Sequence, residues 1–376
     1  MSDDLLESAK SELRKKATDK LNVLFNNPNA LIPDSTVVEQ ASGEVTAEYV
    51  SSLIEPENRL ADITAGLGIN TYFLALKAKT VVAVEKESSR AEILKHNLKI
   101  LGVKNVVVVN SDCVDWLRNC DLELDCIYAD PSRRDSHNRR VMDLSDYSPD
   151  LHEVVTLANG RCKRILVKVS PMLDIHKLYQ EFPQIKAFHI LEVHKEVKEI
   201  ILDLELDVTD CSSKNVPPPL LYVAILTQGK APLVYKFSIS DKLLDKELFY
   251  LEGKESIQSG QYLYEPSAAL MKASMFGALS KRFDGLKKLA HDTHFFISDN
   301  YYPSFPGKIF EVKELLNSAR LKRLRGSNAN VISRNHPSKA NELQTKFKLK
   351  PSDTDYIIAC KAGKDKVILS AKNCKV

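Results

Sequence analysis

Residues 60–87 contain two short apolar runs that each end in an acid and are separated by a glycine turn. The first run ends in Asp62 and leads to Gly66 and Gly68, and the second run, VVAVE, ends in Glu85. Glycines let the backbone approach a ligand at the start of a helix, and an acid at the second strand end can accept both hydroxyls of a ribose. The spacing therefore predicts the first βαβ unit of a doubly wound α/β sheet, with a nucleotide-type cofactor at its strand ends.

The residues around the glycines separate two candidate cofactors. A dinucleotide fingerprint has a third glycine that lets a helix pack closely beneath a pyrophosphate, but Thr71 stands at that position here. Asp62 precedes the glycines and would place a negative charge close to the pyrophosphate. The same carboxylate suits a cation such as the amino group of S-adenosyl-L-methionine. We therefore expect a methyltransferase-type site, with a nicotinamide-dependent oxidoreductase and a glycine loop without a ligand as the alternatives.

The next segments continue the alternation of helices and strands. Residues 87–101 have helical spacing of apolar residues and end before Gly102, a typical C-cap. Residues 105–112 form an apolar strand that ends in Asp112, which is also placed to cap the short helix that follows. Residues 124–135, LDCIYADPSRRD, then predict a fourth strand that leads into the crevice of the sheet.

Seven motifs spread along the chain indicate a family. They are DITAGLGINT, VVAVEKE, ADPSRRD, KVSPMLD, YLYEPSAALMKA, FPGKIFEV and ANVISRNHP. With these motifs the chain resembles class I S-adenosylmethionine-dependent methyltransferases from about residue 37 to 206, and more narrowly the bacterial group with a C-terminal THUMP-like domain. The resemblance implies a Rossmann-like core with N-terminal helices, followed by small ferredoxin-like and THUMP-like α+β modules. We expect an N-terminal helical segment over 1–36, the methyltransferase domain over 37–240, the ferredoxin-like module over 255–300 and the THUMP-like domain over 301–376.

The resemblance implies that the cofactor is S-adenosyl-L-methionine and that it lies over the first three strand ends. The residues expected to bind it are Asp62, Thr64, Ala65, Gly66, Gly68, Glu85, Lys86 and Asp112. Asp112 would accept a hydrogen bond from the adenine amino group. Gln40 and Ser42, in a helix expected over 35–53, either approach the cofactor or lie at the surface.

The residues at the end of the fourth strand bear on which atom of a base would be methylated. Enzymes that methylate exocyclic base nitrogens typically carry Asn/Asp-Pro-Pro-aromatic there, whereas this chain has Asp130-Pro131-Ser132-Arg133. The departure argues against methylation of an amino nitrogen. C5 methylation of uridine needs a thiolate after the fifth strand, where this chain has Ser170, and a serine hydroxyl is a far poorer nucleophile. Asp130 remains the candidate for orienting or deprotonating the nucleophile.

Basic residues follow this strand end directly. Arg133 and Arg134 are succeeded by His137, Arg139 and Arg140. Guanidinium groups at a crevice can hold a phosphate or stack on a base, although charge runs are usually solvated loops. The expected catalytic set is Asp130, Pro131, Arg133 and Arg134, with Lys168 and Ser170 as secondary candidates.

The N- and C-terminal parts of the chain have recognisable elements of their own. Residues 3–25 predict an amphipathic helix, and residues 262–300 predict a helix opened by Pro266 and then a strand. Tyr264, Glu265 and Lys272 either face the active site or serve as capping and solvent-facing residues. We expect a strand then a helix over 305–316, and a hairpin over 355–372 around Gly363 and Lys364.

Cations are dense near the C-terminus. They are Arg320, Lys322, Arg323, Arg325, Arg334, Lys339, Lys346, Lys348 and Lys350. Such a cluster suits contacts to an RNA backbone, although lysine-rich surfaces are common. The whole chain is nearly balanced, with a net charge of +3, so a basic face must be local.

Composition sets the remaining limits. A chain of 376 residues can form two or three domains. Its seven cysteines include no C-x-x-C pair, which argues against structural zinc and for reduced thiols in the cytoplasm. No apolar run reaches the roughly 18 residues that span a bilayer. We expect no metal, no membrane contact and no obligate protein partner.

These patterns favour a cytoplasmic enzyme that transfers a methyl group from S-adenosyl-L-methionine to a base in structured RNA. Two other hypotheses stay open. One is a non-catalytic RNA-binding or assembly protein that retains the methyltransferase fold, and the other is a methyltransferase for a protein or a small molecule.

Overall fold

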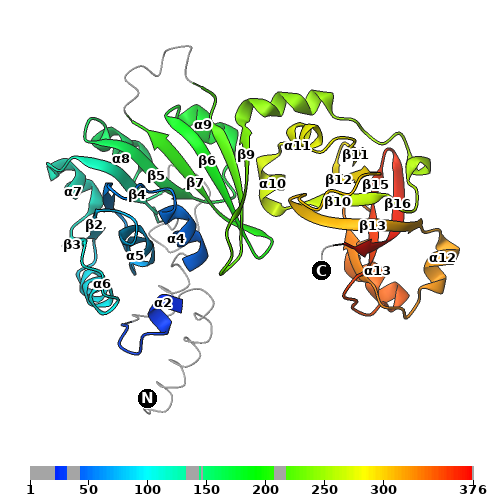
Figure 1. Ribbon diagram of the computed structural model, residues 1–376, viewed down its shortest axis with the longest axis horizontal. Helices are drawn as coiled ribbons and strands as arrows, with labels where there is room; N and C mark the ends of the chain where they lie inside the picture. Colours follow the sequence, from blue (N-terminus) through cyan, green and yellow to red (C-terminus); the bar gives the residue numbers. More distant parts are fainter. Residues whose placement is uncertain (1–21, 32–42, 133–143, 145–146, 207–216, 375–376) are drawn as a thin grey trace. The chain divides into compact units, whose positions relative to one another are not determined.

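The computed structural model describes residues 22–31, 43–132, 144, 147–206 and 217–374 (Figure 1). The chain divides into two compact units, Met1–Lys236 and Phe237–Val376. Each unit is built around a sheet of its own, so the two are described separately.

The described residues of the first unit, with Phe237 and Ser238 at the end of β9, form a sheet of nine strands in the order β3-β2-β1-β4-β5-β7-β6-β8-β9. The strands are β1 (Arg59–Asp62), β2 (Thr80–Glu85), β3 (Val106–Asn110), β4 (Leu124–Ala129), β5 (Cys162–Val169), β6 (Ile185–Val193), β7 (Glu196–Glu205), β8 (Leu220–Leu226) and β9 (Leu233–Ser238). The first five strands are parallel, and the order reverses direction between β1 and β4. In open sheets of this kind, ligands bind outside the carboxyl ends of the strands at that reversal.

The parallel part of this sheet is extended by an antiparallel pair, β6 and β7. β7 runs antiparallel to both β5 and β6, and β8 is parallel to β6. The helices are α2 (Asn22–Phe25), α4 (Glu44–Ser51), α5 (Ile69–Ala75), α6 (Ser88–Ile100), α7 (Cys113–Asn119), α8 (Leu151–Ala158) and α9 (Ile175–Glu181). The rest of the helix expected over 3–25, and Gln40 and Ser42, lie outside the described residues.

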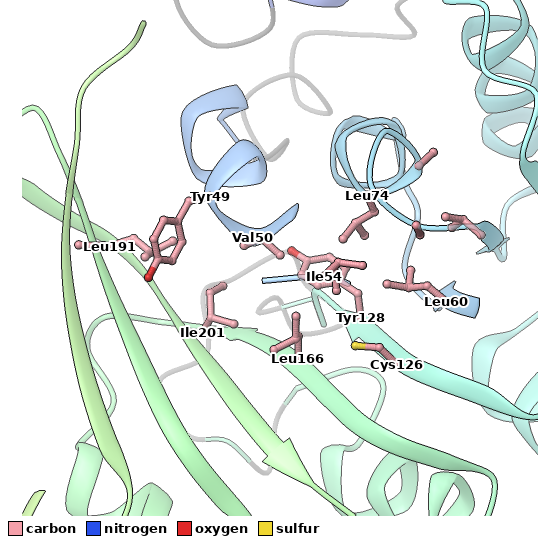
Figure 2. Close-up of a cluster of buried hydrophobic side chains, with 14 of the residues drawn as sticks. Tyr49, Val50, Ile54, Leu60, Leu74, Cys126, Tyr128, Leu166, Leu191 and Ile201 are labelled. Carbon is pink, nitrogen blue, oxygen red and sulfur yellow. The ribbon is translucent and has the colours of Figure 1, made fainter. Parts of the chain in front are cut away.

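A buried apolar cluster joins α4 and α5 to the strands that carry the site (Figure 2). Val50 of α4 and Leu74 of α5 pack with Tyr128 of β4 and Leu166 of β5, all at most 1% exposed. Burying a side chain of this size is worth roughly 1.5–3 kcal/mol. The packing therefore fixes the strand ends on a rigid support.

The second unit has a sheet of seven strands among its described residues, in the order β11-β12-β10-β13-β16-β15-β14. The strands are β10 (Tyr262–Pro266), β11 (Lys287–Ala290), β12 (Thr293–Ser298), β13 (Gly307–Leu315), β14 (Asn330–Ser333), β15 (Asp355–Ala362) and β16 (Asp365–Asn373). Its helices are η2 (Ile239–Glu247), η3 (Lys254–Ser256), α10 (Ala268–Ala273), α11 (Phe276–Arg282), α12 (Ser318–Arg323) and α13 (Ala340–Phe347). The segments expected to form ferredoxin-like and THUMP-like modules share this sheet, because β10 pairs with β13.

The sheet of the second unit bends back on itself. The turn of the expected hairpin, β15–β16, contacts β11, where Gly363 N donates to Leu289 O at 2.6 Å. Lys361 also pairs with Asp292 at 3.0 Å. The bend encloses an apolar core whose members include Leu263, Phe310 and Leu369.

Two predictions for this unit are wrong. The helix expected to open at Pro266 is two helices, because Ser274 has a positive φ of 54° and ends α10, while Pro266 belongs to β10 and Ser267 is the N-cap. Lys242 of η2 donates to Ser274 O at 2.7 Å, so a tertiary contact overrides local helix propensity.

The second error concerns residues 305–316, where a strand followed by a helix was expected. No helix forms there, because β13 continues as far as Leu315, which pairs with Leu369 of β16. The helix α12 begins only after its N-cap, Asn317. The pairing partner comes from more than fifty residues away, so local pattern could not reveal it.

Candidate active site

The glycine turn joins β1 to α5 at the reversal of the sheet. Gly66 and Gly68 have positive φ values of 52° and 83°. A Cβ atom on Gly68 would also lie 2.2 Å from Leu94 Cδ1 of α6. Gly68 is therefore favoured by its backbone conformation, and a Cβ atom there would also displace the buried Leu94 side chain.

Asp62, at the end of β1, is completely buried and has two hydrogen-bond donors. Thr71 Oγ1 donates to Oδ2 at 2.6 Å, and Thr64 N donates to Oδ1 at 3.2 Å. Burial, together with the charges of Asp130 and Glu85, raises the pKa of Asp62 to about 7 despite these hydrogen bonds. In the sequence, Thr71 served only as evidence against a dinucleotide, and its role as a donor to Asp62 was missed.

Glu85, at the end of β2, binds the backbone of the glycine turn through its side chain. Its Oε2 atom accepts from Gly66 N at 3.0 Å, and Oε1 accepts from Glu87 N at 2.9 Å. Each carboxylate oxygen has a second lone pair. The side chain therefore keeps acceptor capacity for hydroxyl groups while it fixes the turn.

Asp112 caps α7, as one of its two sequence interpretations predicts. Its Oδ1 atom accepts from Val114 N at 2.9 Å, and Lys86 Nζ donates to Oδ2 at 3.0 Å. Partial burial acts to raise the pKa of Asp112, but the hydrogen bonds from Lys86 and Val114 outweigh it and lower the pKa. Contact with an adenine stays a prediction.

Thr64 connects the glycine turn to the end of β4. Its Oγ1 atom accepts a hydrogen bond from Asp130 N at 2.7 Å, and the buried Pro131 follows. Ser132 exchanges two backbone hydrogen bonds with Ser148, at 2.7 and 3.1 Å. The remaining basic candidates, Arg133 and Arg134 with His137, Arg139 and Arg140, lie outside the described residues.

Lys168 of β5 lies between two carboxylates. Its Nζ atom is 2.5 Å from Asp130 Oδ2 and 3.5 Å from Glu199 Oε2 of β7. Lys168 was only a secondary candidate in the sequence, and Glu199, the first residue of the run EIILDLEL, was missed. Ser170 accepts from Met172 N at 3.2 Å and so stabilises its own turn.

The carboxyl edge of the sheet is therefore rich in acids. Asp62, Glu85 and Asp130 come from the ends of β1, β2 and β4, and Asp62 interacts electrostatically with both of the others. Lys168 is the buried cation beside them. Such an arrangement favours a cationic ligand over a diphosphate.

Metal-ligand groups, thiols and helix lengths were compared in the described part of the chain. No group of three or more His, Cys, Asp or Glu side chains there could hold a metal ion. The thiol of Cys113 is half-buried, and burial raises its pKa to about 11. None of the described helices is long and apolar enough to cross a membrane.

The fold and the arrangement of its strand ends define the class of the protein. The first unit has the α/β fold of a class I methyltransferase, and the second unit contains ferredoxin-like and THUMP-like domains. Residues 57–146 match the family described as RNA cap guanine-N2 methyltransferase, residues 262–306 match a ferredoxin-like domain, and residues 307–372 match a THUMP domain-like family.

Individual proteins resemble parts or all of the chain. Ribosomal RNA small subunit methyltransferase J of Francisella tularensis subsp. novicida is 28% identical over 127 residues, which are 30% of this chain and 53% of that protein. The chain thus spans about half the length of this relative. An uncharacterized RNA methyltransferase of Mycoplasma mobile is 28% identical over 85 residues, 23% of each chain.

A solved structure resembles the chain over nearly its whole length. It is the crystal structure of a candidate methyltransferase from Porphyromonas gingivalis W83, with a TM-score of 0.85 and 27% identity. The match covers 98% of this chain and 90% of that one.

Proposed function

We propose that the protein is an S-adenosyl-L-methionine-dependent methyltransferase that acts on a base in structured RNA. The observation that carries the proposal is the acidic carboxyl edge of the first sheet, formed by Asp62, Glu85 and Asp130. S-adenosyl-L-methionine carries a sulfonium and an ammonium group and no phosphate. An acidic edge attracts such a ligand and repels the diphosphate of a dinucleotide.

The roles of the residues follow from their places around the turn. Asp62 and the backbone from Thr64 to Gly68 would hold the amino-acid part of the donor, and Glu85 would accept hydrogen bonds from ribose hydroxyls. Asp112, fixed by Lys86, would face the adenine. The bound donor supplies an electrophilic methyl group.

Asp130 would receive the substrate at the end of β4. Its backbone is fixed by Thr64 Oγ1 and its Oδ2 atom by Lys168, so the carboxylate has a defined position. A nucleophile held in line about 3 Å from the methyl carbon gains much of its rate from alignment alone. Asp130 would orient this nucleophile and accept its proton, and Arg133 or Arg134 would hold phosphate or base.

An RNA substrate is supported by the names of the relatives and by the charge of the second unit. Residues 318–350 contain nine Lys and Arg residues and a single acid, Glu342. Arg320 pairs with Glu314, and Arg334 pairs with Glu265. Among the described residues the other cations form no ion pair. They are Lys322, Arg323, Arg325, Lys339, Lys346, Lys348 and Lys350.

Backbone hydrogen bonds bring these cations together. Gly326 N donates to Phe347 O at 2.9 Å, and Lys350 N donates to Ser327 O at 3.0 Å. The loop that contains Arg325 therefore lies beside the segment that contains Lys348. We call this group, residues 322–325 and 346–350, the basic patch, and propose that it binds RNA phosphates. An RNA substrate would also place the enzyme in the cytoplasm.

Calorimetry and a transfer assay test the proposal together. The purified chain is titrated with S-adenosylhomocysteine and with NADH, and is then incubated with methyl-labelled donor and total RNA from a strain that lacks the gene. Binding of S-adenosylhomocysteine and label in RNA are expected. Binding without transfer would favour the non-catalytic RNA-binding hypothesis, and binding of NADH alone would favour an oxidoreductase.

The assay also distinguishes possible acceptor atoms. The family matched by residues 57–146 is described by guanine-N2 chemistry, whereas Asp130-Pro131-Ser132-Arg133 departs from the motif typical of amino-nitrogen methylation. Digestion of the labelled RNA to nucleosides separates N2-methylguanosine from other products.

A further inference from the structure

A row of three charged side chains begins in the candidate active site at Asp130 and continues across the two neighbouring strands, β5 and β7. The acid of Asp130 is 23% exposed, whereas the side chains of Lys168 and Glu199 are 7% and 9% exposed. Asp130 is thus the solvent-exposed end of the row, and Glu199 is its buried end.

Strand pairing explains why the three meet. β4 and β5 are parallel with Ala129 opposite Val167, so Asp130 comes next to Lys168. β5 and β7 are antiparallel with Lys168 opposite Ile201. Because residues two apart on a strand face the same side, Glu199 lies on the same face as Ile201 and diagonally beside Lys168.

The charges in this row depend on one another. An ammonium group removed from water without a partner costs several kcal/mol. Lys168 is therefore held by its two carboxylates, and a change in either one alters its position. In turn Lys168 fixes Oδ2 of Asp130, and in the described part of the chain no hydrogen bond reaches Oδ1. Oδ1 is the atom left to face a substrate.

We infer that Lys168 is a positioning residue for methyl transfer that acts through Asp130, and that Glu199 acts only by holding Lys168 in place. This inference rests on the proposed function. It adds Glu199, which lies on a strand away from the glycine turn, to the residues on which turnover depends.

A double-mutant cycle tests the inference in the full-length protein. The variants are Lys168→Met, Glu199→Gln and the double variant, assayed with methyl-labelled donor and total RNA from a strain that lacks the gene. Lys168→Met should lower kcat on the order of 100-fold, the effect of a misplaced reacting group. Glu199→Gln should lower kcat about 10-fold in the wild-type background and have no further effect in the Lys168→Met background.

Controls separate positioning from loss of fold. S-adenosylhomocysteine affinity and RNA KM should stay within a few fold in every variant, and Lys168→Arg, which keeps the charge, should recover part of kcat. Glu205→Gln removes an exposed acid from the same strand β7 and should leave kcat unchanged.

The experiment separates failure of this inference from failure of the proposed function. Independent, multiplicative losses from the two substitutions, or losses confined to KM, would overturn the inference while the proposed function stands. If Lys168→Met fails to fold, the inference is tested with Glu199→Gln and Lys168→Arg instead. An unchanged kcat in Glu199→Gln would then overturn the inference. A wild-type chain that binds the donor but methylates no RNA would overturn both.

Discussion

Thr71 places a hydroxyl at the position that the third glycine occupies in a dinucleotide fingerprint. It occupies the third position of the glycine pattern and donates to the buried Asp62 at 2.6 Å. Thr71→Val would leave a buried carboxylate oxygen without this donor, and should lower the free energy of unfolding by about 1–3 kcal/mol. Denaturant titration measures the effect. Thr71→Ser keeps the hydroxyl and should retain most of the stability, and equal losses in both variants would contradict the role given to the hydrogen bond.

Asp62 makes stability depend on pH in a direction that can be worked out. Its pKa is about 7 in the fold, above its ordinary value of 3.8, because it is buried. The folded state therefore binds a proton more tightly than the unfolded state, and the stability from this group is complete below about pH 4 and is lost as pH rises to about 7.

We expect the stability of the wild type, relative to Asp62→Asn, to fall between pH 4 and pH 7 and to level off above it. The full difference is on the order of 4 kcal/mol for a shift of about three pKa units. Denaturant unfolding of both proteins at several pH values checks this. A difference that is constant with pH, or that grows as pH rises, would refute the assignment.

At the scale of elements, much of the first unit could be predicted from sequence. The strands of residues 60–62, 81–85 and 124–129 and the helix of 88–100 were visible because apolar periodicity and glycine punctuation agree with the fold. Apolar periodicity does not predict the partners of the charged residues inside these strands. Arg164 of β5 and Asp203 of β7 form a bidentate pair at 2.7 and 2.9 Å that only strand order brings together.

Residues of two motifs, YLYEPSAALMKA and ANVISRNHP, make contacts that stabilise the second unit. Tyr264 is buried and its hydroxyl donates to Asn300 O at 2.5 Å. Glu265 pairs with Lys308 at 3.0 Å and with Arg334 at 2.9 Å. These contacts account for Tyr264 and Glu265 without an active-site role, and they join YLYEPSAALMKA to ANVISRNHP. Sequence alone could not separate such motifs from catalytic ones, because both carry polar residues in fixed patterns.

The pairing of β10 with β13 depends on one glycine. A Cβ atom on Gly307 would lie 2.0 Å from Glu265 O, a backbone atom. Gly307→Ala must therefore push the two strands apart, and should cost at least the roughly 1–3 kcal/mol typical of overpacking. Thermal or denaturant unfolding tests this against Gly43→Ala, whose Cβ would have its nearest neighbour at 3.9 Å. Equal stability of the two variants would contradict the close approach.

At the scale of the whole molecule, we assign chemistry to the first unit and RNA binding to the basic patch of the second. Replacing Arg325, Lys348 and Lys350 by glutamine should weaken RNA binding for all sequences and lower the slope of log affinity against log salt by about one for each phosphate that is no longer neutralised. Donor affinity should not change, because these residues are remote in sequence from the glycine turn and belong to another unit.

Fluorescence titrations of labelled RNA at several salt concentrations measure this slope. Lys198→Gln is a matched control, since Lys198 is an exposed cation of the first unit that already pairs with Glu196. An unchanged slope in the triple variant, or an equal change in the control, would exclude the basic patch as the RNA-binding surface.

The nucleosides of cellular RNA test the central claim most directly. RNA from a strain that lacks the gene is digested and compared by mass spectrometry with RNA from its parent, and with RNA from the deletion strain that expresses wild-type or Asp130→Ala protein. We predict that one methylated nucleoside is missing in the deletion strain, that wild-type protein restores it and that Asp130→Ala does not. Identical nucleosides in all four RNAs would contradict the claim that this protein methylates RNA.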